Sequence, residues 1–385
     1  MNLHLHDRSS STSLSNKRVV IKVGSSLLTD EKGNLNYDFI RRLCSNLSDL
    51  KRQGYELILV TSGAIIAGLG ILKKVGVLKK LAQDLREKQA AAAIGQVQLM
   101  HIYEQEFARR GVLVAQVLMT REDFEERSRY LNARNTLLTL FNLGVVPVIN
   151  ENDTVAVEEI QVGDNDTLSA IVASKVEADY LIILTDVDGL YTDNPIKNKN
   201  AKLIPEIKEI TSEIEMLAAK NPAGERGTGG MLTKIEAAKI ATCSGVTLIV
   251  ANGRKENVVN RILQAENIGT KFLPQEQMLK ARARWIAFGM KSKGKIYIDS
   301  GAAKALIEKG KSLLSSGIIS VEGNFEHGDM ISIYGLDGKE IARGLTYYSA
   351  DEIEKIKGKK SQEIEKILKR KDYDEVIHRD NLVLL

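Results

Sequence analysis

Residues 19–28 read VVIKVGSSLL, and this stretch decides how the chain is interpreted. An apolar run broken only by Lys22 leads into a Gly-Ser-Ser turn. Continuous apolar runs indicate strands buried on both faces, as in a parallel sheet covered by helices. Ligands bind beyond the carboxyl ends of such strands, where Gly24 and the serines would let backbone N–H groups approach a phosphate. Lys22 would add a full positive charge there, although a lysine beside an ordinary turn would give the same pattern.

Similar apolar runs follow this first one, at residues 57–60, 112–117, 145–149, 180–184 and 246–250. Helical patterns separate the runs. An apolar stripe from Ile40 to Leu50 predicts one helix, and the Ala-rich stretch 87–107 predicts another. Alternating strands and helices form right-handed βαβ units. We therefore expect a three-layer α/β/α domain with a mainly parallel sheet over residues 17–273.

The sequence changes in character after residue 273. A charged linker, 274–290, leads into residues 291–385, where short apolar segments are broken by glycines. These segments are 294–298, 318–322, 330–334 and 341–344. They predict a small β-barrel or sandwich. A second domain agrees with the length of 385 residues, because one core usually stops growing at about 250–300. The Ser-rich start, 1–16, predicts a disordered tail and lacks the features of a secretory signal.

Composition excludes several classes of protein. No apolar run approaches the roughly 18–20 residues that a membrane span requires, so we expect no membrane association. The 54 Lys and Arg nearly balance the 50 Asp and Glu, which does not indicate a nucleic-acid binder. The two cysteines, Cys44 and Cys243, both fall in predicted helices, which fits a reducing cytosol and offers no zinc spacing.

Polar residues follow several of the predicted strands. Ser62 comes directly after the second strand, where it would be either a plain helix N-cap or a ligand for a substrate carboxylate. The fourth strand runs into Asn-Glu-Asn-Asp at 150–153, which is either a turn or an acidic site for the ammonium of an amino acid. The sequence Gly-Asp-Asn-Asp-Thr at 163–167 lacks the third acidic ligand, the glycine and the bidentate glutamate of a calcium loop.

Two further stretches indicate a nucleotide. Residues 185–191, TDVDGLY, place small and acidic side chains where a ribose or adenine would rest. Residues 227–231, GTGGM, precede Lys234 and predict a second phosphate cradle, with a flexible connector as the alternative. The P-loop, the GxGxxG fingerprint and the HRD and DFG elements of protein kinases are all absent from the sequence. A kinase with this sequence would belong to another class.

Together, these motifs resemble the amino acid kinase family. VVIKVGSSLL, LVTSGAIIAG, VVPVINENDTVA, VGDNDTLSA, LTDVDGLYT and GTGGMLTK occur in the order seen in its glutamate-phosphorylating members. SLLSSGIISVEGNFEHGDMISI and HRDNLVL resemble the PUA domain that bacterial members carry. The resemblance covers residues 17 to 380, and VGSS alone would also suit relatives that act on aspartate, carbamate or a nucleoside monophosphate.

The resemblance implies a role for each matching residue. Lys22 and Lys234 would contact the transferring phosphate, and Asp166 would orient both lysines. Glutamate would be held by Ser62, Asp153 and Asn165. ATP would be held by Lys22, Gly24, Thr185, Asp186, Thr228, Gly229, Gly230, Met231 and Lys234. The resemblance further implies Mg²⁺ bound with ATP, and it identifies no protein ligand for the metal. It also implies the first step of proline synthesis with feedback inhibition by proline, a homo-oligomer, and a cytoplasmic location.

A carboxylate acceptor would need no general base, because its ordinary pKa of ~4.3 leaves it ionised at neutral pH. We accordingly expect no catalytic histidine and a structural role for His101 in its helix. Two alternatives remain. A sister kinase acting on aspartate or acetylated glutamate is one, and Asp153 favours a free ammonium over an acetylated one. An RNA-binding protein is the other, but residues 291–385 carry 17 Lys and Arg against 16 Asp and Glu, a weak phosphate footprint.

Overall fold

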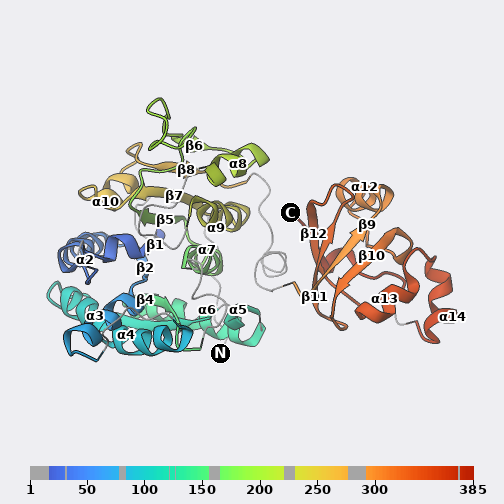
Figure 1. Ribbon diagram of the computed structural model, residues 1–385, viewed down its shortest axis with the longest axis horizontal. Coiled ribbons are helices and arrows are strands. Elements are labelled where there is room, and N and C mark those ends of the chain that lie inside the picture. The colour runs from blue at the N-terminus through green and yellow to red at the C-terminus, as the bar shows by residue number, and fades with distance from the viewer. Residues whose placement is uncertain are drawn as a thin grey trace. The chain divides into compact units, whose positions relative to one another are not determined.

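A computed structural model describes residues 17–30, 33–77, 84–120, 122–125, 127–155, 165–220, 230–275, 292–371 and 373–385. The chain forms two compact units. An eight-stranded sheet lies in the first, and a separate five-stranded sheet lies in the second (Figure 1). The predicted tail, 1–16, and most of the predicted linker lie outside the described residues. Among the described helices, none is long and apolar enough to cross a membrane.

The first sheet has the strand order β3-β4-β2-β1-β5-β7-β8-β6. Its strands are β1 (Arg18–Val23), β2 (Glu56–Val60), β3 (Val114–Met119), β4 (Val146–Glu151), β5 (Tyr180–Thr185), β6 (Glu206–Ile207), β7 (Thr247–Asn252) and β8 (Thr270–Phe272). All six apolar runs became strands, and all six pair in parallel. The pattern missed β6 and β8, which have two and three residues, and β8 runs antiparallel to β7.

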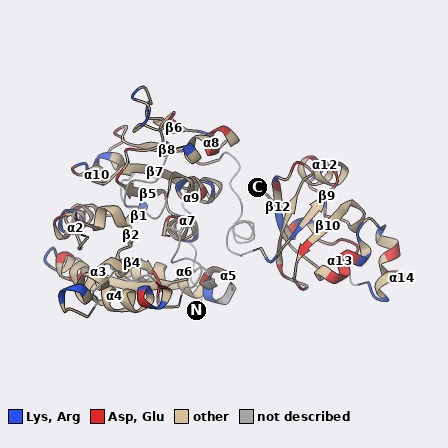
Figure 2. Cartoon of the chain, in the orientation of Figure 1, with Lys and Arg blue, Asp and Glu red and all other residues tan. Residues whose placement is uncertain are grey.

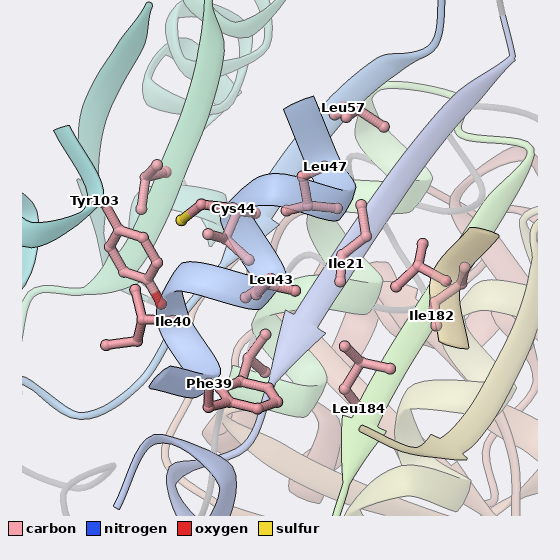
Figure 3. Packing of buried hydrophobic residues seen from close by; sticks show 14 of the residues in the cluster. Ile21, Phe39, Ile40, Leu43, Cys44, Leu47, Leu57, Tyr103, Ile182 and Leu184 are labelled. Carbon is pink, nitrogen blue, oxygen red and sulfur yellow. The ribbon is translucent and has the colours of Figure 1, made fainter. Parts of the chain in front are cut away.

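Helices cover both faces of this sheet. The helices of this part of the chain are α1 (Ser25–Leu28), α2 (Tyr37–Arg52), α3 (Ala64–Lys74), α4 (Leu85–Ala108), α5 (Glu122–Glu125), α6 (Arg127–Asn142), α7 (Asn165–Lys175), α8 (Ser212–Lys220), α9 (Met231–Cys243) and α10 (Val258–Leu263). Of these, α5 and the start of α6, residues 121–133, group with the second compact unit. On one face the apolar stripe of α2 packs against alternate residues of β1 and β5, such as Ile21 and Ile182 (Figure 3). The opposite face of β1 and β5 lies against α7. The three-layer expectation is thus confirmed.

Two glycines allow α3 and α4 to cross in backbone contact. A Cβ added to Gly68 would lie 1.8 Å from the carbonyl oxygen of Ala91, and one added to Gly95 would lie 1.8 Å from that of Ala64. Any side chain at either position would therefore force the helices apart. This close crossing fixes the position of Gln96, which directly follows Gly95.

The second unit has the strand order β10-β9-β11-β12-β13. Its strands are β9 (Gly294–Ile298), β10 (Ile318–Gly323), β11 (Met330–Tyr334), β12 (Glu340–Leu345) and β13 (Leu382–Leu384). Its helices are α12 (Ser300–Lys309), η2 (Ser315–Gly317), α13 (Ala350–Ile356), η3 (Ser361–Glu363), α14 (Ile364–Leu368) and η4 (Arg379–Asn381). The four expected strands are present. The helices between them were not predicted from the sequence. Acidic and basic residues are interspersed along α13 and α14 (Figure 2).

Candidate functional site

The polar residues singled out above follow neighbouring strands. In the sheet order β4-β2-β1-β5, the carboxyl ends of four parallel strands lie side by side. The backbone N–H of Gly24 donates a hydrogen bond to the Leu184 carbonyl at 3.0 Å, so the turn after β1 lies against the end of β5. This edge is where an open α/β sheet binds its ligands.

Two lysines and one aspartate meet at this edge, and we call Lys22, Asp166 and Lys234 the charge cluster. Lys22 Nζ lies 2.6 Å from Asp166 Oδ1, and Lys234 Nζ lies 3.2 Å from Asp166 Oδ2. The Thr233 hydroxyl also donates to Asp166 Oδ2, at 2.8 Å. The carboxylate therefore bridges the two ammonium groups and holds them on either side of itself.

The charge cluster is buried, and its charges do not cancel. Lys22, Asp166 and Lys234 are 6%, 0% and 4% exposed. Burial alone would raise the pKa of the Asp166 carboxyl, but Lys22 and Lys234 hold it well below its usual range. Burial lowers the pKa of the Lys22 ammonium, and Asp166 opposes that shift. Two cations and one anion leave an excess positive charge away from water, which is an environment suited to a phosphate.

Local structure explains how three residues so far apart in sequence meet. Side chains alternate between the two faces of a strand, so Lys22 points away from the α2 side, where Ile21 packs, and toward α7. Asp166 is the second residue of α7, and Lys234 is the fourth residue of α9. Both helices thus present their first turn, where the helix dipole favours anions.

The residues predicted to bind ATP lie around the charge cluster in part. The Thr185 hydroxyl donates to Asp186 Oδ1 at 3.1 Å at the end of β5. Gly230 is the N-cap of α9, and Met231 is its buried first residue. A Cβ on Gly24 would lie 4.0 Å from Lys22 Nζ, so glycine leaves the space beside that ammonium open. Thr228 and Gly229 lie outside the described residues.

Four uncharged side chains form a second group, which we call the amide cluster: Ser62, Gln96, Asn150 and Asn165. Asn165 Nδ2 donates to Ser62 Oγ at 2.8 Å and to Asn150 Oδ1 at 3.3 Å. Asn150 Nδ2 in turn donates to Gln96 Oε1 at 2.9 Å. The cluster joins the ends of β2 and β4 to the start of α7 and the middle of α4.

Two atoms of the amide cluster are buried without a partner among the described residues. They are Gln96 Nε2, a donor, and Asn165 Oδ1, an acceptor. A buried polar atom that lacks a hydrogen bond costs about 1–3 kcal/mol. A ligand with both an acceptor and a donor would remove this cost.

Ser62 is not a plain N-cap, and that alternative is wrong. The N-cap of α3 is Gly63, in the left-handed region at φ 98°, and no side chain caps the helix. Glycine adopts this conformation without strain, so the chain can turn sharply after β2. The Ser62 hydroxyl is thereby directed to Asn165.

Asp153 lies in the turn after β4, two residues beyond the end of the strand. Burial raises the pKa of its carboxyl to about 6. A carboxylate in this state would be stabilised by an added cation, because an opposite charge offsets the cost of burial. The turn can therefore accept an ammonium group.

Gln96 was not predicted from the sequence, and the prediction for His101 is not supported by the structure. Gln96 sits inside an Ala-rich helix, where no motif marks it, and only the close α3–α4 crossing brings it to the site. His101 does lie in α4, but its side chain is exposed and contacts Gln105. Because the His101 side chain is exposed, the structure does not support the expected structural role.

The described residues contain no group of three or more His, Cys, Asp or Glu side chains that could hold a metal. A divalent ion that serves a kinase need not have such a group, because Mg²⁺ keeps several waters and binds largely through substrate phosphates. The charge cluster and its surroundings are compatible with a metal that arrives with its nucleotide.

Comparison with known proteins agrees with this geometry. The amino acid kinase family matches residues 17–252, and the PUA domain matches residues 294–368. The chain belongs to the amino acid kinase family, and it is an enzyme of the kinase class. It is similar to the glutamate 5-kinase of Thermoanaerobacter sp. (strain X514), with 53% identity over 368 residues, 96% of this chain and 98% of that protein. The glutamate 5-kinase of Moorella thermoacetica is 52% identical over 369 residues, 96% of each chain. The resemblance seen in the motifs is confirmed.

Proposed function

We propose that this enzyme transfers the γ-phosphoryl group of ATP to the side-chain carboxylate of L-glutamate, forming L-glutamyl 5-phosphate. One observation carries the proposal. Asn165 and Asp166 are consecutive, yet Asn165 belongs to the amide cluster and Asp166 to the charge cluster. A ligand held by the first therefore has one end directed at the second. The relatives named glutamate 5-kinase support glutamate as that ligand.

The charges of the site fit a carboxylate acceptor. Phosphoryl transfer depends on positioning and on stabilising charge spread over oxygens. Glutamate brings a nucleophile that is already ionised, so the main obstacle is repulsion between two anions. Lys22 and Lys234 offset that repulsion, and Asp166 keeps both ammonium groups in place. Asp166 would not act as a base, because its pKa is held too low for it to accept a proton at neutral pH.

Binding roles follow from the same contacts. Ser62, Asn165 and Asp153 would hold glutamate, with the Asp153 carboxylate facing the ammonium. Gly24, Thr185, Asp186 and the loop that ends at Met231 would hold ATP. Mg²⁺ would arrive with ATP and neutralise charge on its phosphates. Inhibition by proline, a homo-oligomeric state and a cytoplasmic location remain part of this proposal, and each needs its own measurement.

The test is ADP release in a coupled assay with glutamate, aspartate and N-acetylglutamate, with hydroxylamine present to trap acyl phosphate. We expect glutamate to give ADP and hydroxamate in equal amounts. Faster turnover with aspartate or N-acetylglutamate would favour a sister kinase. ADP without hydroxamate would mean that the acceptor is not a carboxylate.

A further inference from the structure

We propose that Gln96 is a specificity-determining residue that contacts the substrate directly, with its Nε2 donating to the α-carboxylate of the amino acid. The inference rests on the proposed function and adds a residue to it. It starts from the buried Nε2 of Gln96, which has no partner among the described residues although Oε1 of the same side chain is engaged. One half of the amide is thus occupied, and the other half is available.

The position of Gln96 selects which part of the substrate it meets. Two hydrogen bonds connect Asn165 to Asn150 and Asn150 to Gln96. Asn165 is adjacent in sequence to Asp166 of the charge cluster, whereas Gln96 is two hydrogen bonds removed from Asn165. A substrate whose reacting carboxylate faces the lysines therefore presents its other end to Gln96. In an α-amino acid with an acidic side chain, that end carries the α-carboxylate, an acceptor that matches the free donor.

The backbone around Gln96 holds this donor in place. Gly95 packs on the carbonyl of Ala64, so α4 cannot shift away from α3 without losing that contact. A donor on a rigid element discriminates well, because a ligand that lacks the matching acceptor leaves the donor buried and unpaired. The span from Gln96 to the charge cluster would then favour one side-chain length over another.

Two variants separate a direct contact from two simpler explanations. Gln96→Glu keeps an acceptor for Asn150 but replaces the free NH₂ with oxygen and adds a negative charge. Gln96→Met removes both functions and adds no charge. An effect through Asn150 alone would leave Gln96→Glu normal, and an effect of charge alone would leave Gln96→Met normal. Gln105→Glu is the matched control, since Gln105 is exposed on the same helix.

The measurement is KM for glutamate and for ATP in each variant, with thermal unfolding to confirm the fold. We expect both Gln96 variants to raise the glutamate KM by about 10–100-fold, the usual loss for a hydrogen bond to a charged group. The ATP KM should stay within about twofold. A normal glutamate KM in either variant, or equal rises in both KM values, would overturn the inference. Absence of hydroxamate from the unaltered enzyme would instead refute the proposed function.

Discussion

Asn165 of the amide cluster and Asp166 of the charge cluster are consecutive residues of α7. The two clusters nevertheless differ in how their buried polar atoms are paired. In the charge cluster, Asp166 is paired with a lysine on each side. In the amide cluster, Gln96 Nε2 and Asn165 Oδ1 are buried without partners. Paired charges are tolerated with or without ligand, whereas unpaired polar atoms favour only a ligand that satisfies them. We therefore propose that the charge cluster serves phosphoryl transfer and the amide cluster serves recognition of the substrate.

The largest expected effect comes from the charge cluster. Lys234→Ala should lower kcat by about 10²–10³, the usual loss when a donor that stabilises developing charge is removed, with little change in the glutamate KM. Lys239→Ala is the control, because Lys239 lies on the same helix and pairs with Glu215 on a partly exposed surface. Near-normal turnover of Lys234→Ala would place the phosphate contact elsewhere and break the division of roles.

A change in a residue that is proposed to bind glutamate should alter the KM for glutamate rather than kcat. Asp153→Asn should raise the glutamate KM by about 10–100-fold, because it removes the charge that faces the ammonium. The ATP KM should change little. Asp337→Asn, in an exposed turn of the second unit, is the control. If both KM values of Asp153→Asn rise together, Asp153 has a structural role and the account of recognition fails.

The dependence on pH should separate substrate recognition, through Asp153, from phosphoryl transfer. With the pKa of Asp153 near 6, the carboxylate is charged above that pH and becomes neutral as the pH falls through it. Attraction for the ammonium is then lost, so kcat/KM for glutamate should fall about tenfold per pH unit below 6. The kcat should stay nearly flat from about pH 6 to 8, because no base is needed. Persistence of the kcat/KM limb in Asp153→Asn would exclude Asp153 as its source.

The smallest effect is expected from removing residues 281–385. A chain that ends at Lys280 keeps all eight strands of the first sheet and both clusters, so it should fold and retain glutamate kcat/KM within about threefold. Circular dichroism and the coupled assay would measure this. An insoluble or inactive product would show that residues after 280 complete the first domain or its assembly.

The sequence predicted the parts of the fold that depend on local pattern. Six apolar runs became six parallel strands because a strand buried on both faces needs such a run. β6 and β8 are too short to show any periodicity. The helices α12, α13 and α14 were not predicted, because the short apolar segments separated by glycines around them indicate strands.

Site residues were predictable where they follow a strand and not where they depend on packing. Lys22, Ser62 and Asp153 were predicted because each lies at or just after the end of a strand, and these strand ends lie side by side at one edge. Gln96 was not, since it reaches the site through the α3–α4 crossing, and only Gly68 and Gly95 hint at that contact. The role of Ser62 needed the backbone of Gly63, which occupies the cap position.

Isotope transfer tests the central claim that the side-chain carboxylate is the nucleophile. Glutamate labelled with ¹⁸O in both γ-carboxylate oxygens is converted with ATP, and hydroxylamine then cleaves the acyl phosphate at carbon. The ¹⁸O content of the released inorganic phosphate is measured by mass spectrometry, with glutamate labelled in its α-carboxylate as the control. Attack by the γ-carboxylate on phosphorus predicts one ¹⁸O in each phosphate from the γ-label and none from the α-label. Unlabelled phosphate from γ-labelled glutamate would contradict the account.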